Sequence, residues 1–266
     1  MFVVVGERIN TSRKKVQEAV IDKDYAYIQN DVEKQQAAGA TFIDVNAGAR
    51  IGYERKDMEW LLMVIQEVVT VPLCLDSPDP EVLEMAYDMV KEMPMINSIS
   101  LEKKRYDVMV PFLKGKDCNI VALCMDDSGM PKSTQDVIDR AGRLVKDLEG
   151  IGVKREAIYI DPLIQPISTD GTKGLMAMDA VRGIMGKFPG VHTICGLSNI
   201  SFGLPQRKII NRTFLTLLMC AGLDAAIIDP LDDTIMAVLK TTEMLMGNDE
   251  YCANYLKGVR AGQIVS

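Results

Sequence analysis

Eight short apolar segments, rich in β-branched residues, recur through the whole chain, and this recurrence is the strongest constraint on its fold. They occupy residues 2–5, 42–45, 73–75, 95–96, 120–124, 158–160, 193–195 and 225–228. Their starts lie about 32 residues apart on average, which is the length of one strand–helix unit. We therefore expect a fold built from repeated strand–helix pairs, with no linker that would mark a domain boundary.

The segments between these runs have the spacing of amphipathic helices. Residues 58–68, 81–92 and 134–148 repeat apolar side chains at i, i+3, i+4 and i+7, which places those side chains on one helix face. Ser133 or Thr134 is expected to cap the third helix, as Ser and Thr commonly do. Alternating strands and helices predict a parallel sheet that is covered by helices.

Eight such units in 266 residues predict an α/β fold, a single (β/α)₈ TIM barrel domain over residues 1–266, because these barrels are about 250 residues long. The alternative is a doubly wound open sheet. That fold usually has a glycine-rich phosphate turn after its first strand, and no G-x-G-x-x-G follows Val5. The pattern therefore favours the barrel.

Charge and composition exclude several classes of function. The chain has 30 basic and 37 acidic residues, whereas nucleic-acid binders show a basic excess. It has one histidine and six cysteines, without a C-x-x-C pair, so we expect no protein-bound metal. No uncharged run approaches the ~20 residues of a membrane helix, and the N-terminus lacks the basic start of a signal peptide. The sequence predicts a cytoplasmic protein that binds neither membrane nor nucleic acid.

Polar side chains follow the apolar runs, at the strand ends where a (β/α)₈ barrel carries its functional residues. Seven of the eight runs are followed closely by a carboxylate or a carboxamide, namely Glu7, Asn46, Asp76, Asn97, Asp126, Asp161 and Asp229. The remaining run leads into Gly196, Leu197, Ser198 and Asn199. One Asp or Asn after a strand is ordinary turn chemistry, but seven in phase predict a ring of acids and amides around the barrel mouth.

A ring of this composition favours one kind of ligand. Carboxylates accept hydrogen bonds, and carboxamides both donate and accept them. Such groups suit a flat heterocycle with several N–H groups and a carbonyl, for example a 2-amino-4-oxo pterin. The ring lacks the serine and histidine of a catalytic triad, and the chain lacks a P-loop for a nucleoside triphosphate.

Structural roles are the alternative for several of these residues. Asp76 stands before an S-P-D-P sequence and is a candidate helix cap, and Asp161 stands before a proline and is a candidate strand terminator. We interpret Asn211 as the cap of a helix over residues 212–220. His192 precedes a predicted strand, and we interpret it as a surface or core residue rather than a ligand.

Six ordered motifs resemble those of the pterin-binding methyltransferases, which move a methyl group between N5 of tetrahydrofolate and the cobalt of a corrinoid protein. They are GERIN at 6–10, CLDS at 74–77, INS at 96–98, YIDPLI at 159–164, GLSN at 196–199 and NRTF at 211–214. The resemblance covers nearly the whole chain. It implies a barrel like that of dihydropteroate synthase, a homodimer and methyltransferase activity.

The resemblance also implies roles for individual residues. Asp76, Asn97 and Asp161 would hold the polar edge of the pterin. Asn199 would be the catalytic amide near N5, with Gly196 and Ser198 in the same loop. Arg207 would lie near the pterin and the folate tail. Glu7 and Asn46 are candidates for supporting contacts behind these residues.

Tetrahydrofolate or its 5-methyl form is then the expected substrate, and the corrinoid (cobalamin) is expected to arrive on a separate partner protein. The overall resemblance is to the family branch that uses methylcorrinoid protein to methylate tetrahydrofolate during glycine betaine demethylation. The reverse transfer, from methyltetrahydrofolate to a corrinoid/iron–sulfur protein, is the alternative. Dihydropteroate synthesis and a non-catalytic folate-binding module are more distant alternatives.

Overall fold

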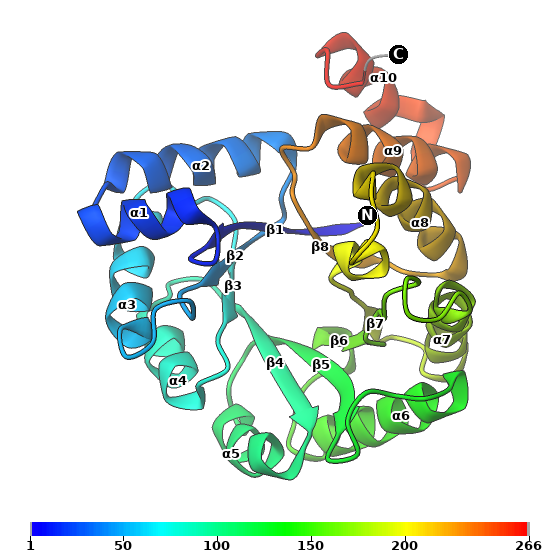
Figure 1. Cartoon of the computed structure of the whole chain (residues 1–266), viewed down its shortest axis with the longest axis horizontal. Helices are drawn as coiled ribbons and strands as arrows, with labels where there is room; N and C mark the ends of the chain where they lie inside the picture. The colour runs from blue at the N-terminus through cyan, green and yellow to red at the C-terminus, as the bar shows by residue number, and fades with distance from the viewer. Residues whose placement is uncertain (1, 265–266) are drawn as a thin grey trace.

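The computed structural model describes residues 2–264, and eight parallel strands form a barrel in that part of the chain (Figure 1). The strands are β1 Val3–Asn10, β2 Phe42–Asn46, β3 Leu73–Asp76, β4 Met95–Leu101, β5 Asn119–Asp126, β6 Ile158–Asp161, β7 His192–Thr193 and β8 Ala225–Ile228. Each of the eight predicted runs overlaps one of these strands. The predicted α/β barrel is therefore confirmed.

Helices form a ring around the strands, and α10 lies outside that ring beyond α9 (Figure 1). The α-helices are α1 Lys14–Asp22, α2 Tyr25–Ala38, α3 Glu54–Ile65, α4 Pro80–Met89, α5 Lys103–Leu113, α6 Thr134–Gly150, α7 Lys173–Lys187, α8 Arg207–Ala221, α9 Asp233–Leu245 and α10 Ala253–Arg260. Short 3₁₀ turns are η1 Arg155–Ala157, η2 Leu197–Ser201 and η3 Glu250–Cys252. Within the described chain, no helix combines the length and apolar character needed to cross a membrane.

Helix boundaries follow local capping chemistry. Ser133 caps α6, and its hydroxyl accepts a hydrogen bond from the Asp136 amide at 3.1 Å. Asp79, rather than Asp76, caps α4 by accepting from the Glu81 amide at 2.9 Å. Asp76 is thus free of the capping role that the sequence left open for it.

Strand side chains alternate between the barrel interior and the helical layer, as the strand period of two requires. The interior cluster contains one residue from each strand, namely Val5, Phe42, Cys74, Met95, Val121, Tyr159, Ile194 and Ala225, where Ile194 directly follows β7. Larger apolar clusters fill the space between strands and helices. The interior is therefore packed, and the mouth above it carries the polar strand ends.

The strands pair in sequence order, and β1 pairs with β8. Between β7 and β8 the described residues form no ladder, and one isolated bridge joins Ile227 of β8 to Gly196, which follows β7. Side chains close the rest of this seam. Asp224 bridges to β7, accepting from the Thr193 amide at 2.8 Å and contacting His192 Nδ1 at 2.7 Å. His192 also stacks on Tyr159 with ring centroids 4.6 Å apart. It therefore lies within β7 and has a structural contact there, whereas the sequence placed it before the strand.

Asp224→Asn is expected to lower the free energy of unfolding by about 0.5–1 kcal/mol at pH 6, the size of a partly exposed ion pair. The hydrogen bond from Asp224 raises the pKa of His192. The ion pair therefore stabilises fully below the unfolded pKa of about 6.5, and this stability is lost as pH rises through the folded pKa. Urea denaturation at pH 6 and pH 9 measures the difference. An equal loss at both pH values would contradict this role, and His192→Gln is the matched non-titrating control.

Candidate active site

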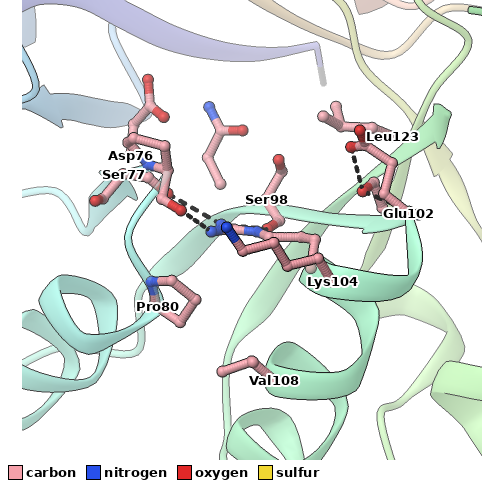
Figure 2. Close-up of a pocket in the computed structure, with 12 residues that line it drawn as sticks. Asp76, Ser77, Pro80, Ser98, Glu102, Lys104, Val108 and Leu123 are labelled. Carbon is pink, nitrogen blue, oxygen red and sulfur yellow. Dashed lines mark hydrogen bonds between the residues drawn. The ribbon is translucent and has the colours of Figure 1, made fainter. Parts of the chain in front are cut away.

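Polar residues at the carboxyl ends of β2 and β3, and one within β4, lie side by side at the barrel mouth. Asn46 pairs in register with Asp76, and Asp76 pairs with Asn97. Asp76 and Asn97 line a cavity of about 540 Å³ that extends between the loops after β3 and β4 (Figure 2). The structure thus brings together three residues that the sequence selected separately.

Asn46 fixes the orientation of the Asp76 carboxylate. Its Nδ2 donates to Asp76 Oδ2 at 2.8 Å, and its Oδ1 accepts from the Gly48 amide at 3.0 Å. The pKa of Asp76 is raised by burial, while the Asn46 hydrogen bond and the Arg105 charge oppose that shift. Asp76 therefore presents an oriented acceptor toward the cavity.

Arg105, which the sequence did not select, joins the loop after β3 to strand β4 beside this cavity. Its guanidinium donates to the carbonyl oxygens of Ser77 at 3.0 Å and Ser98 at 2.6 Å, and also to that of Pro78. In Figure 2, dashed lines next to Ser77 mark hydrogen bonds, and Ser98 lies to the right of them. Burial lowers the pKa of Arg105. Its partners lie 28 and 7 residues away in sequence, so no local pattern could have identified it.

Asp161 is buried at the end of β6, with 8% of the residue exposed. Its Oδ1 accepts from the Leu163 amide at 2.7 Å. Burial raises its pKa to about 7, and that hydrogen bond opposes the shift. Asp161 is in register with Leu123, which lines the same cavity as Asp76 and Asn97. It is therefore an acceptor whose charge changes near neutral pH.

Asn199 lies in η2, immediately after β7, and is exposed. A Cβ atom built on Gly196 would lie 3.4 Å from Asn199 Nδ2, so the small residue at 196 leaves room for the amide. Arg207 holds this turn in place, donating to the Ser198 carbonyl at 2.7 Å and the Ser201 hydroxyl at 3.0 Å. The guanidinium of Arg207 is thus engaged with the loop that carries Asn199.

A second cavity, of about 380 Å³, lies between η2 and the ends of β1 and β8 and is lined by Glu7, Ser198 and Asn211 among others. The pKa of Glu7 is raised by burial and then by Asp229, and nearby arginines oppose the shift. Arg8 anchors this wall, because it donates to Asp31 at 2.8 Å and to Asp229 at 2.9 Å. Glu7 and Ser198 therefore line a different cavity from Asp76 and Asn97.

Two sequence-based interpretations are wrong. Asn211 does not cap a helix, because α8 begins at Arg207, four residues earlier, and Asn211 Oδ1 is buried without a partner among the described residues. Asp126 does not belong to the mouth ring: its carboxylate accepts from Ser128 and pairs with Arg140 at 3.1 Å. Near the barrel mouth, the β5 side chain that packs against the interior cluster is that of Leu123.

Metal-ligating side chains do not cluster in the described part of the chain. Over residues 2–264, no group of three or more His, Cys, Asp or Glu side chains is placed to hold a metal ion. Four cysteines are buried, and Cys220 and Cys252 are exposed. The chemistry available at the mouth is hydrogen bonding by acids, amides and a loop-bound arginine.

Comparisons with known proteins agree with this geometry. The family model described as "Pterin binding enzyme" matches residues 6–229. The chain is 36% identical to a methylcorrinoid:tetrahydrofolate methyltransferase of Eubacterium limosum, over 99% of this chain and 98% of that protein. It is also 32% identical to methionine synthase of Mycobacterium leprae, over 85% of this chain and 20% of that longer protein.

Solved structures with the same fold include two dihydropteroate synthases. The enzyme from Xanthomonas albilineans, in complex with 7,8-dihydropteroate, superposes with a TM-score of 0.70 at 14% identity, covering 92% of each chain. The enzyme from Coxiella burnetii, in complex with pteroic acid, gives a TM-score of 0.70 at 14% identity, over 91% of this chain and 94% of that chain. At this identity the likeness concerns the fold.

Proposed function

The chain belongs to the pterin-binding enzyme family, and from that premise we propose that it is a methyltransferase that moves a methyl group from a methylcorrinoid to N5 of tetrahydrofolate. The observation that carries the proposal is the 36% identity, along 99% of the chain, to a relative named for this reaction. The hydrogen-bonding groups at the barrel mouth support it.

Three residues are proposed to hold the pterin. Asp76 and Asp161 would accept hydrogen bonds from its 2-amino and ring N–H groups, and Asn97 would use both halves of its amide. Support comes from the register that places Asp76 beside Asn97, and from the burial of Asp161. Asn46 would act through Asp76, whose carboxylate it contacts at 2.8 Å.

Asn199 is proposed as the catalytic residue. When N5 of tetrahydrofolate attacks the methyl group, positive charge develops on that nitrogen, and its proton must then leave. A neutral amide that accepts from N5–H stabilises this charge without a strong acid. Gly196 and Ser198 shape the loop, and Arg207 holds it through the Ser198 carbonyl. Glu7, which lines the same cavity as Ser198, is a candidate to receive the proton through water, since burial raises its pKa and makes it a stronger base.

The remaining features of the proposal rest on the family resemblance. The corrinoid would be carried by a separate partner protein, glycine betaine would supply the methyl group, and residues 1–266 would form one pterin-binding domain in a homodimer. Sedimentation velocity tests the dimer. Supplying candidate corrinoid proteins, with and without the enzyme that methylates each from betaine, tests the donor.

The direct experiment is to incubate the protein anaerobically with tetrahydrofolate and methylcobalamin. The cobalt absorbance should change, and 5-methyltetrahydrofolate should form in equal amount. Starting instead from methyltetrahydrofolate and cob(I)alamin measures the opposite direction, which the alternative with a corrinoid/iron–sulfur partner requires to be faster. Tight folate binding without methyl exchange would overturn the proposal in favour of a binding module. Turnover of pterin pyrophosphate with p-aminobenzoate would favour dihydropteroate synthesis.

A further inference from the structure

Asp44 lies in the barrel interior, one layer beneath the proposed pterin site, and the proposed reaction gives it no role. It is the third residue of β2, on the same strand face as Asn46, because side chains two apart share a face. Only 2% of the residue is exposed. Its partner in register on β3 is Cys74, which lies two residues before Asp76.

Among the described residues, the groups that act most strongly on Asp44 are acids, a thiol and an amide, and none of these is a cation. They are Glu7 from β1, Cys74 and Asp76 from β3, and Asn97 from β4. The Cys74 thiol and the Asn97 amide are neighbouring donors that lower its pKa, whereas Asp76 and Glu7 are acids that raise it. The Oδ1 atom of Asp44 has no partner among the described residues.

This environment suits a neutral carboxyl group. An ionised carboxylate with an unpaired oxygen in an apolar interior is costly, and two neighbouring acids add repulsion. Where two buried carboxyls interact, the proton stays on the one with less support for a charge. Asp76 receives the Asn46 amide at 2.8 Å and the favourable charge of Arg105, so Asp44 retains the proton. Burial and the two acids correspondingly raise the pKa of Asp44 well above its ordinary value.

We propose that Asp44 is a positioning residue of the pterin site: it stays protonated in the folded protein, fixes the Asn97 amide from beneath, and leaves Asp76 as the charged acceptor. The identity of the ligand rests on the proposed function, whereas the protonation of Asp44 does not. Ionisation of Asp44 would add a second negative charge under Asp76. The pterin site would then weaken at alkaline pH.

The first test uses the ligand-free protein. An acid whose folded pKa is raised loses stability as pH climbs from its unfolded pKa of about 4 to its folded pKa. Asp44→Asn, which copies the neutral form, should therefore have a higher Tm than the wild type at pH 8, with a smaller difference at pH 4. Asp179→Asn, an exposed acid on α7 paired with Arg182, is the matched control and should show no such trend. A lower Tm for Asp44→Asn at pH 8 would overturn the proposal.

The second test measures anaerobic tetrahydrofolate binding by calorimetry from pH 6 to pH 10. Asp44→Ala should weaken binding about 10-fold at pH 7, because it removes the polar group beneath Asn97, whereas Asp44→Asn should keep most of the wild-type affinity. The wild type should lose affinity at alkaline pH, and Asp44→Asn should lack this loss. If both proteins lose tetrahydrofolate affinity equally at alkaline pH, the proposed role of Asp44 is wrong. A wild type that binds no tetrahydrofolate overturns the proposed function instead, and the Tm series still decides the protonation.

Discussion

Asn199→Ala is expected to lower the rate of methyl transfer by about 10²–10³, which is the usual effect of removing one preorganised donor or acceptor from a site of developing charge. The dissociation constant for tetrahydrofolate should change much less, because Asn199 lies on the exposed turn η2 rather than among the buried acceptors of the mouth. Single-turnover kinetics with methylcobalamin and saturating tetrahydrofolate measure the chemical step, and calorimetry measures binding.

Asn30→Ala, on the exposed face of α2, is the matched control, and it should leave both quantities unchanged. The opposite pattern for Asn199→Ala, with weak folate binding and an unchanged single-turnover rate, would show that Asn199 binds substrate and does not stabilise charge at N5. The distinction matters because an amide that strengthens its contact only in the transition state raises the rate constant, whereas uniform binding lowers KM alone.

Asp161→Asn is expected to weaken tetrahydrofolate binding by about 10- to 100-fold. The variant loses one charge-assisted hydrogen bond, and its amide NH₂ group would face an N–H donor of the pterin. Only the ionised carboxyl group accepts from two pterin N–H groups at once. Because burial raises the pKa of Asp161 to about 7, wild-type affinity should increase as pH rises from about 6 to 8. The variant should show no increase in this window. Calorimetry across the pH series measures both effects.

The stability of Asp161→Asn separates lost binding from misfolding. Asp161 has a folded pKa above its unfolded value, so the wild type loses stability as pH rises toward about 7. The neutral amide does not have this loss. We therefore expect the variant to be at least as stable as the wild type at pH 8 by thermal unfolding. Tight, pH-independent binding by the wild type would exclude Asp161 as the ionising acceptor.

The positions of the strands follow from sequence because the apolar runs are short, evenly spaced and separated by amphipathic segments. Which side chains face the barrel interior is harder to predict, since both faces of a buried parallel strand are apolar. In β5, Val121 and Leu123 face inward, so Asp126 falls outside the ring and pairs with Arg140. In β2, the same alternation places Asp44 under Asn46. The sequence feature that could have indicated this buried acid is its position inside an apolar run.

Other site residues depend on contacts between distant segments. Arg105 reaches carbonyl oxygens in strand β4 and in the loop after β3, where Ser77 is 28 residues away in sequence. Asn211 was misassigned because α8 starts at Arg207 without a side-chain cap, after Gln206 in the left-handed region with φ 53°. Helix-capping preferences therefore could not predict where α8 begins.

The weakly paired boundary between β7 and β8 is where we expect the barrel to open most readily. Regions held by few backbone hydrogen bonds exchange their amide protons through local fluctuations of low free energy. With one bridge and a side-chain link through Asp224, amides near this boundary should exchange with deuterium sooner than those of β2 to β5. The turn that carries Asn199 continues directly from it. Substitutions at this boundary are therefore expected to change the mobility of the turn that carries Asn199, the proposed catalytic amide, and to leave the rigidity of β2 to β5 unchanged.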